Sequence, residues 1–494
     1  MSLRAWSLLL VLSGTIFLEG IDVAMLAVAV PTVRADLGLT TGTAAWVMSA
    51  YVLGYAGFTL LGGRAADLLG RRRMLLGWLT VFLLFSGLGG LADEGWTLIL
   101  ARFVTGVAAA FMTPAALSII TTSYEEGPQR NQALLVFAGT AAGGFSLGLV
   151  IGGLLTQLGW RWVFFAPVLL AAAILAAAIA LVPKEPRPAR ANGAADAQGS
   201  GSVRGGFDLG GALTAAGAML LLAYGIIRLE HGLTGWQVTA AVLAAGLLLA
   251  AAFVAVERRA AAPLVRLGIL RKASLVRADL GALLFVGSFF GFQFVATLYL
   301  QELRGWSSLQ TALALLVMGV DAVLAPTLTP RLVARFGNAR VILGGFVLAV
   351  VSYALFLPVG PDWSYAAMFP TLFLTGLAFA LAYGPLTIAG TEGIAEEEQG
   401  LAGGLLTTAT QFGSAVGIAA VTAVYGLAGG GLDGFRAALV VPLVMVVLGA
   451  VITATGVRGG AARAREVQEA AQAPEASEAR EAPEVPQPAT NVTV

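Results

Sequence analysis

The chain has 494 residues, of which 58% are hydrophobic and 12% are charged, and its formal net charge is +1. A soluble domain carries about 25% charged residues, so this composition indicates a membrane protein. The small net charge excludes the strong positive field of a nucleic-acid-binding protein. With no cysteine and one histidine, His231, the sequence also excludes disulfides, thiolate metal sites and multi-histidine centres. We therefore expect no metal and no cofactor.

Apolar stretches of about 20 residues repeat along the chain, and a helix needs this length to cross a bilayer core of about 30 Å. Backbone groups in lipid must hydrogen-bond within their own segment, so such stretches form helices. The sequence therefore predicts an all-α polytopic membrane protein. We predict fourteen spans, which lie near residues 6–31, 43–62, 74–92, 96–121, 131–155, 162–182, 208–228, 236–256, 278–300, 309–330, 340–358, 364–388, 400–428 and 435–457.

The distribution of positive charge and tryptophan predicts the orientation of these spans. With both termini in the cytoplasm, most of the 29 Lys and Arg residues fall in inner segments, as the positive-inside rule requires. The same orientation places most tryptophans at outer span ends, where aromatic belts form. We expect a monomer in a bacterial cytoplasmic membrane with both termini inside. The tryptophans concerned are Trp46, Trp96, Trp160, Trp162, Trp236, Trp306 and Trp363.

An internal repeat divides the chain into two halves. Residues 63–73, after the second span, align without gaps with residues 330–340, and Gly70 meets Gly337. Two six-helix halves related by an axis along the membrane normal are a plan used by transporters. The predicted parts are an N-terminal half 1–183, a cytoplasmic linker 184–206, two inserted helices 207–257, a cytoplasmic connector 258–277, a C-terminal half 278–457 and a disordered cytoplasmic tail 458–494.

Two acids interrupt the first apolar stretch. Glu19 and Asp22 are three residues apart and share a helix face. An ionised acid at bilayer depth costs roughly 2.5–3.5 kcal/mol, and two acids on one face repel each other. Uptake of a proton relieves both penalties, so the pair is a hypothetical site for proton coupling or substrate binding. Alternatively, one acid forms a purely structural ion pair with Arg102.

Two further charged residues inside predicted spans, Arg102 and Asp321, are candidates for a functional role. Arg102 keeps its proton, so its expected role is to bias a nearby carboxylate between its charged and neutral forms; the alternative is an arginine that extends to the outer interface. Asp321 has no cation near it in sequence. It is a second candidate for proton binding or for attracting a cationic substrate, unless it only faces a water-filled cavity.

The span near 278–300 is rich in aromatic side chains, which either form a wall for substrate or pack in the core. The residues considered there are Phe289, Phe290, Phe292, Gln293, Phe294 and Tyr299.

Several motifs resemble those of the major facilitator superfamily and, within it, the fourteen-helix drug:proton antiporter family. The resemblance covers the chain up to the tail. It departs from the family pattern at Leu149, where proline is usual, and at Ala24 and Ala27, where threonine and asparagine are usual. The matching motifs are Gly63-x-x-x-Asp67-x-x-Gly70-Arg71-Arg72-Arg73, Arg102-x-x-x-Gly106 and Gly144-x-x-x-Gly148-x-x-x-Gly152-Gly153.

The resemblance implies the major facilitator fold, with two six-helix halves plus two inserted helices, and it implies that Arg102 takes part in proton transfer. It also implies a gating loop that stabilises the outward-facing state, built from Gly63, Asp67, Gly70, Arg71 and Arg73. The alternative is that these arginines only retain the loop inside.

The glycines of the third motif are expected to pack a helix closely. Gly144, Gly148 and Gly152 are four residues apart and therefore stack on one face of a helix. Small residues at this spacing let membrane helices approach closely, so this face, with Gly153 beside it, should seal against a neighbour in one state of the transporter.

We therefore expect a proton-coupled exporter that moves hydrophobic or cationic small molecules by alternating access, with protons and the bilayer as its other partners. No phosphate-binding loop is present, so an enzyme or nucleotide-driven pump is not expected. The alternatives are a transporter of one metabolite, peptide or natural product, and a membrane sensor or scaffold that transports nothing.

Overall fold

A computed structural model describes residues 2–124, 128–183, 208–229, 235–260, 263, 265, 267–391, 394 and 396–455. The predicted linker 184–206, the predicted tail 458–494 and His231 lie outside these ranges. Within them the chain forms helices and no strand. The N-terminal helices are α1 (Leu3–Asp36), α2 (Thr41–Leu69), α3 (Arg71–Gly90), α4 (Gly95–Ser123), α5 (Pro128–Leu158) and α6 (Trp162–Leu181).

The remaining helices follow in chain order. They are α7 (Leu209–Arg228), α8 (Trp236–Arg259), a 3-10 turn at Leu267–Arg271, α9 (Ala273–Leu298) extended by a π turn at Tyr299–Leu303, α10 (Ser308–Leu315), a 3-10 segment at Leu316–Val320, α11 (Asp321–Thr327), α12 (Thr329–Phe336), α13 (Asn338–Phe356), α14 (Tyr365–Thr391), α15 (Glu396–Leu427) and a last helix, Gly431–Thr455.

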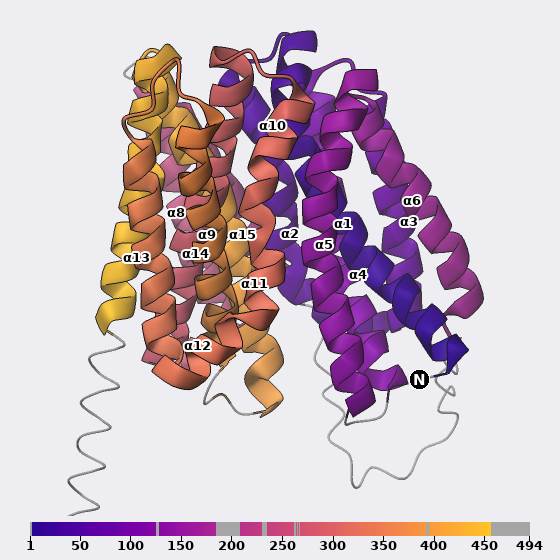
Figure 1. Ribbon diagram of the computed structural model, residues 1–494. Helices are drawn as coiled ribbons and strands as arrows, with labels where there is room; N and C mark the ends of the chain where they lie inside the picture. The colour runs from indigo at the N-terminus through magenta and orange to yellow at the C-terminus, as the bar shows by residue number, and fades with distance from the viewer. Residues whose placement is uncertain are drawn as a thin grey trace, which may run out of the picture.

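The predicted all-helical membrane fold is confirmed. By length and composition, 12 helices of the described chain can cross a membrane, and α2 and α7 occupy the two remaining predicted spans. Figure 1 shows the helices side by side, with α1 and α3–α6 gathered on one side of the bundle and α9 and α13–α15 on the other.

The span predicted near 309–330 is not one continuous helix. It changes from α10 to a 3-10 segment and then to α11. Two glycines let other helices pack closely on this break. A Cβ at Gly319 would lie 2.8 Å from Ser146 Oγ of α5, and a Cβ at Gly376 of α14 would clash with the Met318 carbonyl. Close packing on both sides thus accompanies the break.

The two aligned glycines of the predicted repeat have matching conformations. Gly70 (φ 95°, ψ 125°) lies between α2 and α3, and Gly337 (φ 82°, ψ 153°) lies between α12 and α13. These positive φ angles favour glycine, and in each case a helix starts at the next residue. The same turn therefore recurs at corresponding places in the two halves.

One end of the bundle, which holds Arg34, Trp160 and Glu302, is the predicted outer end. Here a single cluster of buried apolar residues extends from α1, α2 and α6 into the helices of the C-terminal half. Deeper in the bundle a second cluster is built mainly from α1–α6 and includes Ala212 and Ala223 of α7 and Ala415 of α15. The core is thus continuous between the halves at the predicted outer end.

Helix α7 lies against α2 and α15, so it covers a seam between the two halves. Trp46 of α2 and Tyr224 of α7 have ring centroids 5.8 Å apart. A Cβ at Gly57 of α2 would lie 2.7 Å from the Ala216 Cβ of α7. Helix α8 packs on α7, and the buried residues of α8 are Thr239, Gly246 and Glu257.

Candidate functional site

The two acids of α1 lie in the interior of the bundle. Glu19 is 5% exposed and Asp22 is 2% exposed. Asp22 accepts a hydrogen bond from the Arg102 guanidinium of α4 and forms an ion pair with it. The pairing that the sequence allowed as an alternative is therefore present. The structure also brings Glu19, Asp22 and Arg102 together, while their part in proton coupling stays a prediction.

Arg102 has an aromatic neighbour as well as an acidic one. Its guanidinium carbon lies 4.5 Å from the centre of the Tyr51 ring of α2, a cation–π contact. Within the described chain, Arg102 Nε and the Tyr51 hydroxyl have no hydrogen-bond partner. A buried ion pair needs its charges matched, because removing one partner leaves the other charge uncompensated. Asp22 therefore compensates the charge of Arg102.

Glu19 has different partners. Its carboxylate accepts a hydrogen bond from the Thr113 hydroxyl of α4, and Tyr55 of α2 is its other polar neighbour. No ion pair to Glu19 is found among the described residues. Of the two acids, Asp22 is paired with a cation and Glu19 is surrounded by hydroxyl groups. Sequence analysis missed Tyr55 and Thr113, because hydroxyl residues in apolar helices carry no signal of their position.

The arginine motif of α4 also sets the contact between α4 and α2. A Cβ at Gly106 would strike the Tyr51 carbonyl, and one at Gly54 would strike the Phe103 carbonyl. The two glycines let α2 and α4 approach backbone to backbone. This close contact holds Tyr51 beside Arg102.

The glycines of α5 pack on the helix that carries both acids. A Cβ at Gly144 would lie 2.7 Å from the Phe17 carbonyl oxygen, and one at Gly148 would lie 2.8 Å from the Ile21 Cα. Gly152 packs in the same way on Met25. This face therefore seals against α1, as the spacing predicted.

Gly153 contacts the other half of the molecule. A Cβ there would lie 2.8 Å from the Ala312 Cβ and 2.9 Å from the Leu309 Cα, both in α10. The predicted motif thus combines a contact within the N-terminal half with a contact between the halves.

Asp321 lies apart from the acids of α1. It is the first residue of α11, in the C-terminal half, and the described residues form no ion pair with it. The structure therefore does not bring it into the cluster with Arg102. Asp279 of α9, which sequence analysis did not single out, has a buried carboxylate oxygen without a hydrogen-bond partner in the described chain.

The predicted gating loop is mostly helical. Gly63 and Asp67 lie in the last turns of α2, Gly70 forms the turn, and Arg71 and Arg73 lie in the first turn of α3. The side chain of Asp67 lies outside the described residues, so the latch stays a prediction.

Arg72, within the same motif, binds a neighbouring helix. It donates hydrogen bonds to the carbonyls of Val182 (3.0 Å) and Ile179 (2.9 Å) at the end of α6. Basic side chains satisfy the last carbonyls of a helix in this way. This arginine therefore ties α3 to α6.

Most aromatic side chains of α9 pack within the C-terminal half. Phe292 stacks on Tyr353 of α13 with centroids 4.8 Å apart, and Phe289 lies 4.6 Å from Phe379 of α14. Phe290 points toward the other half, with its ring 6.2 Å from that of Phe145 of α5. Core packing therefore accounts for most of this aromatic run.

A small space between the halves adjoins the acidic cluster. Its lining includes Tyr51 and Arg102 from the N-terminal half and Phe290 and Ser414 from the C-terminal half. Its volume is about 10 Å³, which is room for about one water molecule. A larger ligand would need the halves to separate here.

The halves are joined by polar contacts at the predicted outer end. Arg34 of α1 forms an ion pair with Glu302, and Gln301 Nε2 donates to the Val28 carbonyl at 2.8 Å. Thr32 and Ser308 share a hydrogen bond of 3.3 Å. Sequence analysis missed these pairs, because their members are more than 260 residues apart.

Comparison with known proteins gives a consistent result. The family model for the Major Facilitator Superfamily matches residues 12–418. The chain is 34% identical to the puromycin resistance protein of Streptomyces alboniger, over 85% of this chain and 82% of the relative. It is 35% identical to the cephamycin export protein of Amycolatopsis lactamdurans, over 83% of each chain.

The fold is also that of a solved transporter. The crystal structure of the nucleoside transporter NupG superposes with a TM-score of 0.61 at 14% identity, covering 92% of this chain and 98% of that one.

Proposed function

Since the chain belongs to the major facilitator superfamily of membrane transporters, we propose that it is a proton-coupled exporter of antibiotic-like small molecules from the bacterial cytoplasm. The relatives named for puromycin resistance and cephamycin export support the direction of transport and the substrate class. Hydrophobic or cationic compounds are the expected substrates, and the protein is expected to act as a monomer with both termini in the cytoplasm.

The observation that carries the proton-coupling proposal is the different pairing of two adjacent buried acids. Asp22 is matched by Arg102, and the partners of Glu19 among the described residues are hydroxyl groups. Adding or removing a proton at Glu19 changes the net charge of the buried cluster by one. Burial disfavours the ionised form of an acid. Ionised Glu19 therefore favours a state of the transporter that admits water to it, and neutral Glu19 favours a state that does not.

The proposed cycle follows from this difference. In the inward-open state, Glu19 is ionised and substrate enters between the halves. The halves then close inward and open outward, a proton from outside neutralises the acid, and substrate leaves. Arg102 stays paired with Asp22 and keeps the cluster beside the small space between the halves, where Phe290 and Ser414 contribute from the other half.

The proton gradient supplies enough energy for this role. One charge moved through about 100 mV yields about 2.3 kcal/mol, and one pH unit adds about 1.4 kcal/mol. Together these sustain roughly a 500-fold substrate gradient for each exchanged proton. Export at this ratio protects a cell from an antibiotic.

Proton release on substrate binding tests the proposal directly. Purified protein in weakly buffered detergent solution is mixed with puromycin, and a pH indicator records protons. Wild type is expected to release protons, and Glu19→Gln is expected to release none. The absence of release from wild type, with puromycin binding verified separately, would remove the antiport mechanism.

Flux measurements separate the broad exporter from its rivals. Proteoliposomes with an imposed proton gradient are expected to transport puromycin and unrelated hydrophobic dyes, and a protonophore is expected to stop the transport. Transport of a single metabolite would favour a specific transporter, and normal cellular function without any flux would favour a sensor.

A further inference from the structure

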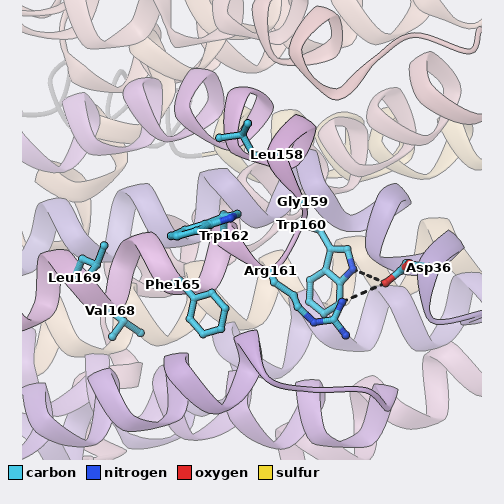
Figure 2. Close-up of a pocket in the computed structure, with 9 residues that line it drawn as sticks. All are labelled: Asp36, Leu158, Gly159, Trp160, Arg161, Trp162, Phe165, Val168 and Leu169. Carbon is cyan, nitrogen blue, oxygen red and sulfur yellow. Dashed lines mark hydrogen bonds and ion pairs between the residues drawn. The ribbon is translucent and has the colours of Figure 1, made fainter.

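A groove on the surface of the N-terminal half lies where α5 ends and α6 begins (Figure 2). Its volume is about 700 Å³. Figure 2 shows Asp36 and Arg161 at one end and Val168 and Leu169 at the other, with the Trp162 and Phe165 rings between them. The groove is thus charged at one end and apolar at the other, which is the character of an amphiphile.

The charged end of the groove is lined by Asp36 and Arg161, and Arg161 also pairs with Asp93 just beyond the lining. Arg161 Nη2 lies 2.8 Å from Asp93 Oδ1, and its Nη1 lies 3.5 Å from Asp36 Oδ2. The Asp36 and Asp93 side chains are 52% and 84% exposed, against 39% for Arg161. The local charge is therefore −1, and both carboxylates keep surface that a ligand can reach.

A tryptophan holds this end in place. The Trp160 indole N–H donates to Asp36 Oδ2 at 2.7 Å, and the Arg161 guanidinium lies 4.5 Å from the centre of the Trp160 ring. Trp160 is itself buried. Asp36 and Arg161 are therefore positioned by the fold.

The apolar end runs along a helix that can cross the membrane. Phe165, Val168 and Leu169 share one face of α6, and Leu169 is 66% exposed. Tryptophan side chains mark the boundary between water and hydrocarbon, so Trp162 places the charged end at this boundary. Leu169 follows Trp162 by seven residues, which in a helix corresponds to about 10 Å along the axis. Leu169 therefore lies at the depth of the acyl chains.

We propose that this groove binds one zwitterionic phospholipid whose headgroup carries a primary amine. The phosphate contacts Arg161, the ammonium donates hydrogen bonds to Asp36 and Asp93, and one acyl chain lies along Phe165 and Leu169. A trimethylated choline headgroup has no N–H to donate to the carboxylates. An anionic glycerol headgroup lacks the ammonium and meets a site of net negative charge. The groove therefore selects the amine.

Lipid retention by the intact protein tests this site. Detergent-purified protein is titrated with phosphatidylethanolamine, phosphatidylcholine or phosphatidylglycerol of identical acyl chains, and native mass spectrometry counts the bound lipids. The first phosphatidylethanolamine is expected to bind about fivefold more tightly than either other lipid, as expected for partly exposed charge pairs. Asp36→Asn/Asp93→Asn is expected to remove the preference over phosphatidylcholine.

A variant at the apolar end tests the site without disturbing its charges. Leu169→Trp places a ring where the acyl chain is expected and should remove the tight first binding event. Ile179→Trp is the matched control, because Ile179 is an exposed residue of the same helix outside the groove. Equal binding of the three lipids by wild type would overturn the proposal, and so would equal retention by the two tryptophan variants.

Discussion

Two acids one turn apart on α1 have different surroundings. Asp22 forms an ion pair with Arg102, so its charge and that of the arginine stabilise each other. Glu19 has the hydroxyl of Thr113 as its donor, and a hydroxyl can serve a neutral carboxyl as well as an ionised one. The two acids share a helix face but have different partners, so we expect different roles for them. Substitution of each acid can separate these roles.

Substitution of the two acids should separate stability from coupling. Asp22→Asn leaves Arg102 buried without a counter-charge, and we expect a loss of about 3–5 kcal/mol of stability. Glu19→Gln keeps an acceptor for Thr113, so it should unfold near the wild-type temperature but lose proton-driven export. Thermal unfolding in detergent and transport by proteoliposomes measure the two effects.

The double variant Asp22→Asn/Arg102→Gln is the control. It removes both charges and should recover most of the stability that Asp22→Asn loses. An Asp22→Asn protein as stable as Glu19→Gln would contradict the assignment of the structural charge to Asp22.

Helices α1 and α5 show how one element positions another. The glycine row of α5 brings its backbone against α1 at Phe17, Ile21 and Met25, on either side of Glu19 and Asp22 in sequence. The π turn after α9 acts similarly, since it carries Gln301 and Glu302 to the end of α1. Contacts with other elements thus set the position of α1, and α1 carries the acids.

Alanine substitutions in α5 should distinguish this packing from helix propensity. Gly148→Ala places a Cβ 2.8 Å from the Ile21 backbone, and we expect it to lower both stability and transport. Gly143→Ala is the matched control, because nothing lies within 4 Å of its added Cβ. The control should gain up to about 1 kcal/mol from helix propensity. Unfolding temperatures of the two variants compare these effects, and equal temperatures would contradict the packing role.

At the scale of the whole molecule, the two halves are closed on each other at the predicted outer end. A continuous apolar core, the Arg34–Glu302 ion pair and the contact of Gly153 with α10 all lie between the halves. Alternating access requires these contacts to break together, whereas contacts within a half persist.

Disulfide cross-links test which contacts must break. The chain has no cysteine, so paired cysteines react only with each other. Oxidised Thr32→Cys/Ser308→Cys replaces two hydroxyls that lie 3.3 Å apart, so it joins the halves and should abolish transport, which reduction should restore. Ser352→Cys/Thr375→Cys replaces hydroxyls that lie 2.7 Å apart in α13 and α14, so it joins two helices of one half and should remain active. Loss of transport on oxidation of the second pair would contradict the persistence of contacts within a half.

Weakening the outer ion pair should shift the balance between states. The Arg34–Glu302 pair is partly exposed, so it contributes about 1 kcal/mol or less. Glu302→Gln should therefore raise the outward-open population by up to about fivefold, measured by labelling of a cysteine placed at Ser308. The exchanged variant Arg34→Glu/Glu302→Arg should restore wild-type labelling. Unchanged labelling in Glu302→Gln would show that the pair does not hold this end closed.

Local patterns were enough to predict the class of fold, the spans, the repeated glycine turn and the glycine face of α5. Hydrophobic length and glycine spacing act within one segment, so one segment reveals them. The sequence also singled out Glu19, Asp22 and Arg102 as candidate site residues, because charge inside an apolar helix is costly wherever the helix lies.

Only the tertiary structure decided that Asp22 is the acid that pairs with Arg102. It alone also placed Thr113 beside Glu19 and Glu302 beside Arg34. These pairings depend on how distant helices rotate and approach. That geometry is determined by many contacts between segments, and no single segment carries it.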